Sequence, residues 1–546
     1  MRLRGRMIHR TGSLLPMLIY SHEATPTSLV YSRCLVLRQQ RALRWWCGLR
    51  QREGGGSLWG AARPSERCRP RDGMEPQPPA EQVLRQLGQL LSQRPGVVTE
   101  LGALLEAAEP RWLLGAGSPA ALGELAAALG AFAALPEREQ DAAELRDGDG
   151  AYAAAAERAA GVGGVFLRLL AKLEAAKVEE SLGPAVEPVL RRVMGHIYVL
   201  AVTHLAGGAW TSAGSRAVAE ELLGALVRAA GCGTVAELLR GRKEEEEGGF
   251  PAVMGLLRPQ LGKDTWKRNP ATKHVFSWTL LHITQPWLSQ HLERVLPPSL
   301  LISDDFREEN KVLGVRCLHH IILNVPGADL CQFNRAQVVY HALYNHLYSR
   351  EAPLIQAVLL CLLDLLPVLE RAQRWQQQPR PTLLCDEVLQ LVLTHMEPEH
   401  RLALRRVYAK TLPAFVRRLG ILIARHLKRL ERVILGYLEV SDGPEEEARL
   451  GILETLQCTI EHAWPRMPCR LPVLLKALLK MIWDVHTDQG STPEPVRAAL
   501  LQRATECLIL LDRCSEGQVK ILLGGVYSCC EENRVRECIR KVQENT

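Results

Sequence analysis

Three residues that could do chemistry lie within four positions of one segment: Cys317, His319 and His320. A cysteine thiolate and a histidine imidazole can bind zinc, and the same pair can form a nucleophilic centre. The surrounding segment SDDFREENKVLGVRCLHHIILNVP, residues 303–326, otherwise has the apolar spacing of a helix. The first question is therefore whether a helix can bring these side chains together.

Helical geometry separates the three side chains. With Leu318 at the centre of the apolar face, Cys317 and His319 lie on opposite flanks, about 160° apart. His320 then points outward, and two ligands on one helix need a spacing such as i and i+4. Zinc also needs three or four converging ligands, and the sequence suggests no second pair nearby. The pattern predicts a structural helix with a partly buried thiol and imidazole, without a metal site or a catalytic role.

No other motif indicates catalysis. The spacing Gly115-x-Gly117-x-x-Ala120 faintly resembles a dinucleotide-binding fingerprint, but it lacks the strand that must precede one. We interpret it as a turn between helices. The sequence has no P-loop, GxSxG elbow, kinase signature or HExxH motif. We therefore expect no enzymatic activity, cofactor or metal, and the alternative left open is a site assembled from distant repeats.

The net charge of +7 originates in the first 73 residues. They contain 14 Arg, no Lys and four acids, which is a net charge of +10. The rest of the chain therefore has a net charge of −3, and its charge gives no argument for nucleic-acid binding. Arg-rich, acid-poor sequence is typical of a mitochondrial transit peptide; a signal peptide and an extension upstream of Met74 are the other interpretations. We favour an unstructured extension and leave residues 1–73 out of the fold.

Cysteine usage and hydropathy indicate the compartment. The 15 cysteines include no CxxC pair, which favours reduced, buried thiols in a cytoplasmic or nuclear protein. The longest apolar run, residues 357–369, contains Asp364 and Pro367. Because a membrane-spanning helix needs about 20 apolar residues, we expect no membrane span.

Composition and spacing predict an all-α fold. Leu and Ala dominate, and the alternating Val and Ile pattern of strands is nearly absent. Acid- or proline-marked helix starts recur every 46 or 48 residues, from Ser303-Asp304-Asp305 to Ser491-Thr492-Pro493. This period is close to that of HEAT and armadillo repeats, whose helix pairs stack into a solenoid. The predicted parts are an Ala/Leu-rich helical region (74–240), a charged linker and connecting segment (241–262), and HEAT-like helical repeats (263–546).

Residues 401–432 form the most basic stretch, with ten Lys or Arg and one acid, Glu431. Toward its end, an apolar stripe predicts one continuous helix with its cations on another face. The stripe consists of Ile423, Leu427, Leu430, Ile434 and Tyr437.

Three interpretations of this basic stretch are open. Nucleic-acid binding is disfavoured, because Tyr408 and Phe415 are too few aromatics for a stacking platform. The cations can instead pair internally with the acid-rich turn at 439–447, or they can receive an acidic segment of a partner protein. The candidate partner-contact residues are Arg405, Arg406, Arg417, Arg418, Arg425, Lys428, Arg429 and Arg432.

Three stretches carry a resemblance to a known family. They are NPATKHVFSWTLLHITQPWLSQHLERVLPPSLLISDDFREENKVLGVRCLHHIILNVP (269–326), THMEPEHRLALRRVYAKTLPAFVRRLGILIARHLKRLERVILGYLEVSDGPEEEARLGILETLQ (394–457) and CLILLDRCSEGQVK (507–520). These three sequence stretches resemble the second Tel-two-interacting protein family. The likeness is close over about 280 residues and looser over residues 74–262.

The resemblance implies a role and no reaction. Members of this family are helical-repeat subunits of the Triple-T complex, with the Tel-two protein and a larger Tti subunit. That complex works with the ninety-kilodalton heat-shock chaperone and its adaptor assembly to mature and stabilise phosphatidylinositol-3-kinase-related kinases, and thereby supports DNA-damage and growth signalling. The family implies no catalytic residue or cofactor, and it implies docking of the C-terminal repeats on the larger Tti subunit.

Other classes predict different behaviour. A nuclear transport receptor or a phosphatase scaffold shares the repeat architecture and would purify with its own partners. An enzyme would show a nucleotide- or metal-dependent thermal shift, and a nucleic-acid binder would show steeply salt-dependent retention on DNA.

Overall fold

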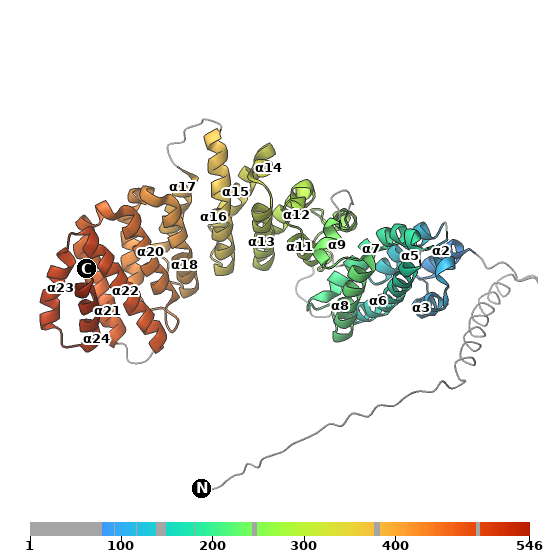
Figure 1. The fold of residues 1–546 in the computed structure, drawn as a ribbon, viewed down its shortest axis with the longest axis horizontal. Coiled ribbons are helices and arrows are strands. Elements are labelled where there is room, and N and C mark those ends of the chain that lie inside the picture. Colours follow the sequence, from blue (N-terminus) through green and yellow to red (C-terminus); the bar gives the residue numbers. More distant parts are fainter. Residues whose placement is uncertain are drawn as a thin grey trace, which may run out of the picture. The chain divides into compact units, whose positions relative to one another are not determined.

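The computed structural model describes residues 79–545, apart from residues 92, 95, 116 and 180 and the segments 138–148, 243–247, 376–382 and 488–491. The predicted extension at 1–73 lies outside the described residues. All regular structure in the described part is helical, which confirms the all-α prediction (Figure 1). Residues 79–106 and 110–546 belong to one compact unit.

The α-helices are α2 (Ala80–Leu90), α3 (Val97–Ala107), α4 (Pro110–Leu113), α5 (Ser118–Phe132), α6 (Asp149–Val178), α7 (Gly183–Leu205), α8 (Ala213–Ala230), α9 (Val235–Arg240), α10 (Phe250–Leu257), α11 (Thr272–Leu281), α12 (Leu292–Ser303), α13 (Glu308–Asn324), α14 (Gly327–Cys331), α15 (Arg335–His346), α16 (Ala352–Trp375), α17 (Leu384–Met396), α18 (Leu402–Leu419), α19 (Leu427–Leu438), α20 (Glu447–Ala463), α21 (Leu471–Thr487), α22 (Glu494–Cys514), α23 (Gln518–Cys529) and α24 (Asn533–Glu544). Short 3-10 helices connect several of them: η1 (Arg258–Gln260), η2 (Trp287–His291), η3 (Gln332–Asn334), η4 (Gly420–Arg425), η5 (Trp464–Arg466) and η6 (Pro468–Arg470).

The helices from α13 onward form two layers. In the first layer, α13, α16, α18, α20 and α22 each pack against the next (Figure 1). In the second layer, α17 packs against α19 and α19 against α21. Each second-layer helix also packs against the first-layer helix that follows it, as α19 does against α20. This stacking of helix pairs is that of a HEAT-like solenoid, because each pair buries its apolar faces on its neighbours.

The N-terminal helices continue into these repeats. Helix α7 packs against α5, α6, α8, α10 and α11, and α11 contacts α13. Most buried apolar side chains from Ala80 to Val542 therefore form one core cluster, and a small separate cluster contains Leu135, Tyr152, Ala155 and Ala271. Residues 241–262, which we expected to connect two parts, contain α10, and its Phe250 and Val253 are completely buried.

Helix starts differ from the sequence prediction at several repeats. The first-layer helices begin at Glu308, Ala352, Leu402, Glu447 and Glu494, so the repeat length is 44 to 50 residues. The prediction that Ser303-Asp304-Asp305 caps the following helix is wrong, because Ser303 is the last residue of α12. Asp305 is buried instead, 2.5 Å from Lys267 Nζ, and Asn310 also donates to its carboxylate. It therefore stabilises the turn between two helices.

The apolar stripe predicted at 423–437 is buried at all five positions. The continuous helix predicted for it is wrong at its start, because Ile423 belongs to η4 and α19 begins at Leu427. Gly420 explains the break. Its φ of 55° lies in the left-handed region, which glycine adopts without steric cost, and it ends α18.

Helix α16 is the one described helix that is both long and apolar throughout most of its length. Its residues Ala352–Ala372 are long and apolar enough to cross a membrane by length and composition, whereas the sequence reasoning found only a shorter run. The same helix packs against α13, α15 and α18, and Leu354, Leu362 and Leu366 are completely buried. Its hydropathy is therefore explained by its central place in the stack.

Candidate protein-interaction surfaces

The cysteine and the two histidines of α13 do not converge. Cys317 is 1% exposed, and burial raises the pKa of its thiol to about 12, so the thiolate needed for catalysis is disfavoured. The His319 imidazole lies 2.7 Å from the Asp364 carboxylate of α16. Within the described residues, no group of three His, Cys, Asp or Glu side chains could hold a metal ion. Helix α13 therefore has a packing role here.

The prediction that His320 points outward is wrong. Its Nε2 lies 2.8 Å from the carbonyl oxygen of Ile283, which follows α11, and the Asn324 side chain contacts its Nδ1. Burial lowers the pKa of His320, although the Ile283 carbonyl opposes this shift. The helical wheel of α13 alone missed this contact, because α11 covers the flank that the wheel left open.

Among the described residues, six of the eight candidate cations have partners inside the chain and two have none. Arg405 is almost fully buried, and its guanidinium lies 3.8 Å from the centre of the Tyr437 ring. It donates to the carbonyl oxygens of Glu399 and Gly436, at 3.1 and 3.2 Å. Arg405 therefore joins α18 to α19, and a partner protein cannot reach most of its side chain.

Arg406 binds the turn that precedes α20. Its Nε lies 3.0 Å from Asp442 Oδ2, and its Nη2 lies 3.1 Å from Glu445 Oε2. Asp442 is buried and accepts the backbone N–H groups of Ala448 and Arg449, so it caps the first turn of α20. At this position the structure has the internal pairing that we considered as an alternative.

Four more candidates form ion pairs between neighbouring helices. Their carboxylate partners lie 32 to 48 positions away, which is about one repeat or less. The pairs are Arg417 with Glu454, Arg418 with Glu370 at 2.6 Å, Arg425 with Asp386 at 3.1 Å, and Arg429 with Glu397 at 3.1 Å. Lys428 and Arg432 are exposed and have no such partner among the described residues.

Helix α23 carries a surface that sequence reasoning missed. Ile521 is 77% exposed and Leu522 is 51% exposed, and Val526 is exposed on the following turn. Val519 and Leu523 are completely buried against the neighbouring helices. Large exposed apolar side chains grouped on one helix are typical of a protein interface. The sequence did contain an indication of this surface: apolar residues occur around most of the helix at 518–529.

Comparison with known proteins identifies the family of this chain. A human protein named TELO2-interacting protein 2 is 58% identical over 455 residues, which cover 82% of this chain and 88% of the human protein. The mouse protein of the same name is 56% identical over 462 residues, covering 83% of this chain and 89% of the mouse protein. A model of the Tti2 family matches residues 235–445. The chain belongs to the Tti2 family.

The Tti2 family match includes the whole basic stretch at 401–432. Residues 235–445 extend from α9 to the turn that Arg406 binds, whereas α23 lies outside that range. Neither the family description nor the names of these relatives denote a catalytic activity. Among solved structures, yeast importin-β matches at a TM-score of 0.41 and 12% identity, covering 84% of this chain and 63% of importin-β. A chain of the Kap95:Nup1 complex matches at a TM-score of 0.41 and 13% identity, covering 86% of this chain and 57% of that one.

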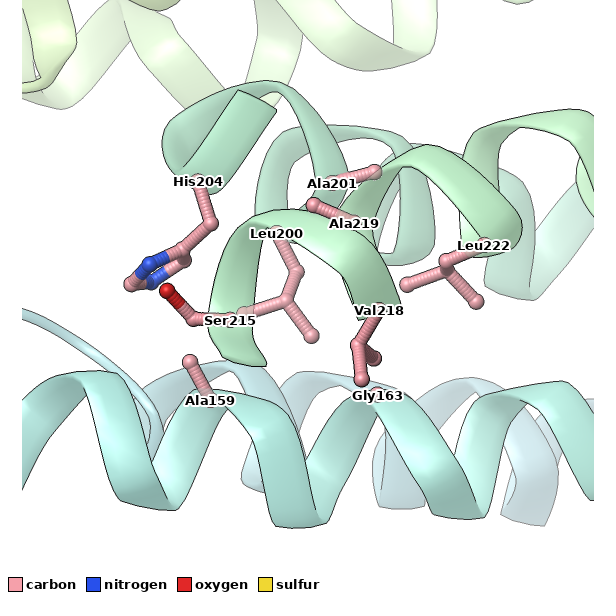
Figure 2. A pocket seen from close by; sticks show the side chains of 9 residues that line it. All are labelled: Ala159, Gly163, Leu200, Ala201, His204, Ser215, Val218, Ala219 and Leu222. Atoms are coloured by element: carbon pink, nitrogen blue, oxygen red, sulfur yellow. The ribbon is translucent and has the colours of Figure 1, made fainter. Parts of the chain in front are cut away.

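Two cavities among the described residues of this Tti2 family member are small or uncharged. One of about 280 Å³ lies between α5, α7, α10 and α11, and no Asp, Glu, Lys or Arg lines it. A second, of about 10 Å³, has room for roughly one water molecule between α6, α7 and α8. Figure 2 shows the imidazole of His204 beside Ser215 in this second cavity. Both ring nitrogens of His204 are buried without a hydrogen-bond partner among the described residues.

We expect His204 to make the fold sensitive to acid. Burial lowers its pKa to about 4, so the folded state keeps the imidazole neutral while the unfolded chain binds a proton near pH 6.5. The unfolding free energy is therefore unaffected by His204 protonation above about pH 6.5, and it decreases as the pH falls from 6.5 toward 4. Lowering the pH from 8 to 5 should remove about 2 kcal/mol of unfolding free energy through this residue. Urea denaturation at both pH values measures the loss.

Two variants separate this effect from general acid denaturation. His204→Leu should reduce the difference between pH 8 and pH 5, because no buried imidazole then remains to be protonated at this position. His400→Leu changes an exposed histidine and should leave the difference as it is in the unmodified chain. Equal pH dependence in all three proteins would contradict the prediction.

Proposed function

We propose that this chain is a non-catalytic scaffold subunit of a Triple-T complex, which supports the maturation and stability of phosphatidylinositol-3-kinase-related kinases. The observation that carries the proposal is 58% identity, over 88% of its length, to a human protein whose name states an interaction with TELO2. The partners proposed are the Tel-two protein, the larger Tti subunit and, through them, the ninety-kilodalton heat-shock chaperone with its adaptor assembly. The proposed location is the cytoplasm and also the nucleus.

A scaffold acts through its surface, and the repeat fold supports such a role. Stacked helix pairs present long faces that a partner can cover without any reaction taking place. We propose that the repeats from residue 263 onward dock on the larger Tti subunit and that α23 forms the centre of this contact. Its exposed Ile521 and Leu522 are the side chains whose burial by a partner would contribute most, at roughly 25 cal/mol for each Å² of apolar surface removed from water.

Replacing two exposed side chains of α23, Ile521 and Leu522, tests the docking. Ile521→Asp with Leu522→Asp should reduce co-purification of the larger Tti subunit by at least about tenfold, because each buried carboxylate would lack a partner. Both residues are exposed in the free chain, so its folding should change little. Co-expression and affinity purification give the measurement, and the levels of the dependent kinases in cells rescued with the variant give the functional readout.

A matched variant provides the control. Val338→Asp with Leu360→Asp places the same charges at two exposed apolar positions of α15 and α16. We expect this variant to keep the partner and the kinase levels. Recovery of importin cargo or phosphatase subunits, in place of Tel-two and Tti proteins, would refute the proposed function itself. Normal co-purification by the α23 variant would refute only the docking site.

A further inference from the structure

The outer faces of α19 and α21 present four cations, of which Lys428, Arg432 and Lys476 form no ion pair within the described chain and Lys480 pairs with Glu439. We propose that these two faces form a binding surface for an Asp- or Glu-rich segment of a partner protein. The α19–α21 surface consists of Lys428, Arg432, Val473, Lys476, Lys480 and Trp483. The inference rests on the proposed scaffold function and adds the chemistry of one partner segment.

On α19, the ion pairs of the neighbouring residues leave Lys428 and Arg432 facing solvent. Arg429 pairs with Glu397, near α17, on one side of the helix. On the other side, Glu431 pairs with Arg470 at the start of α21. Lys428 and Arg432 lie one turn apart between these two contacts, within about 40° of each other on the helix. They are the two candidate cations whose charge the described chain leaves uncompensated.

Helix α21 continues the charge and adds an aromatic side chain. Helices α19 and α21 pack against each other, and Lys480 lies 3.2 Å from Glu439, which directly follows α19. Lys476 lies one turn before Lys480 on the same stripe and is exposed without an ion-pair partner in the described chain. Trp483, at the next position of that stripe, is 47% exposed. The surface therefore combines three uncompensated cations with an indole.

This arrangement favours carboxylates spaced along a peptide. A phosphate group is best bound by arginines and backbone N–H groups that converge on one point, whereas these cations are separated by helical turns on two helices. Single-stranded nucleic acid needs several stacked aromatics, and Trp483 is the single aromatic residue among the six that define the surface. An acidic helix with apolar residues at intervals could match both the row of cations and the exposed Val473 and Trp483 side chains.

Peptide binding to the full chain tests the inference directly. The probe is a fluorescein-labelled peptide of alternating Glu and Leu pairs, about 12 residues long, enough for roughly three helical turns. Fluorescence anisotropy should show binding that weakens as salt rises, because exposed charges are screened. Lys428→Glu with Arg432→Glu and Lys476→Glu should weaken it at least about tenfold, because like charges would then face each other. Trp483→Ala should weaken binding without changing its salt dependence.

The control variant carries the same change of charge elsewhere. Arg294→Glu with Arg316→Glu and Lys410→Glu reverses three exposed cations that also lack an ion-pair partner among the described residues, and it should bind the peptide normally. Equal loss in this control, or equal binding of the peptide with Gln in place of Glu, would overturn the inference. Tighter binding of a phosphopeptide or of a DNA oligonucleotide would also overturn it. Co-purification of the Tti and Tel-two proteins tests the scaffold function separately.

Discussion

Replacing Arg418 by Met is expected to lower the free energy of unfolding by about 3–5 kcal/mol. The Arg418 guanidinium lies 2.6 Å from the Glu370 carboxylate, whose side chain is only 10% exposed. Without the arginine, this carboxyl group would be buried next to α17 and α18 with no charged partner, and burial of an unpaired ionisable group is strongly unfavourable. A change made to probe a surface cation would therefore act on the core between α16 and α18.

A double-mutant cycle isolates the ion pair. Glu370→Leu combined with Arg418→Met replaces both charges with apolar groups and should recover most of the loss, because a buried pair often contributes little more than good apolar packing. Arg432→Met, at an exposed unpaired position, should stay within about 0.5 kcal/mol of the unmodified chain. Urea denaturation of the unmodified chain, the two single variants Glu370→Leu and Arg418→Met, the double variant and the Arg432→Met control gives the comparison. If Arg418→Met unfolds at the same urea concentration as the unmodified chain but loses its partner, Arg418 is a contact residue and the pairing is incidental.

The sequence predicted well those features that depend on residues close together in the chain. The stripe from Ile423 to Tyr437 was expected to be buried because its spacing matches one face of a helix, and it is buried. The separation of Cys317 from His319 followed from the rotation between adjacent residues. The internal pairing of Arg406 was anticipated as an alternative, since an acid-rich turn follows in the next repeat.

Features that depend on how repeats stack were out of reach. Arg418 is paired because Glu370, 48 positions away in the sequence, lies beside it in the fold, whereas Lys428 is exposed and has no ion-pair partner among the described residues. Helical periodicity assigns both to a polar face and cannot tell which cations meet an acid on the neighbouring helix. The same limit explains His320, whose acceptor is a carbonyl group after another helix. It also explains α23, whose exposed face becomes visible only when its neighbours are known.

The second large effect concerns a glycine in the segment that contains Cys317 and the histidines. Replacing Gly314 by Ala is expected to cost about 3 kcal/mol, as overpacking of a core contact does. A Cβ atom at this position would lie 2.2 Å from the backbone nitrogen of Ser303 and 2.5 Å from its Cα. Because these are backbone atoms at the end of α12, no side-chain rotation can relieve the clash, and α13 must move away from α12.

Helix propensity acts in the opposite direction, so a matched glycine reveals the packing term. Ala in place of Gly inside a helix is favourable by up to about 1 kcal/mol, and Gly436 of α19 has open space where its Cβ would be. Gly436→Ala should therefore raise the urea midpoint, while Gly314→Ala lowers it. Gly451→Ala should also lower it, because its Cβ would lie 2.7 Å from the Ala409 carbonyl oxygen of α18. If the urea midpoint rises in all three variants, α12 and α13 can separate at little cost. If it rises in Gly436→Ala and falls in the other two, close backbone contact between helices, more than the cysteine or the histidines, explains why the segment has this sequence.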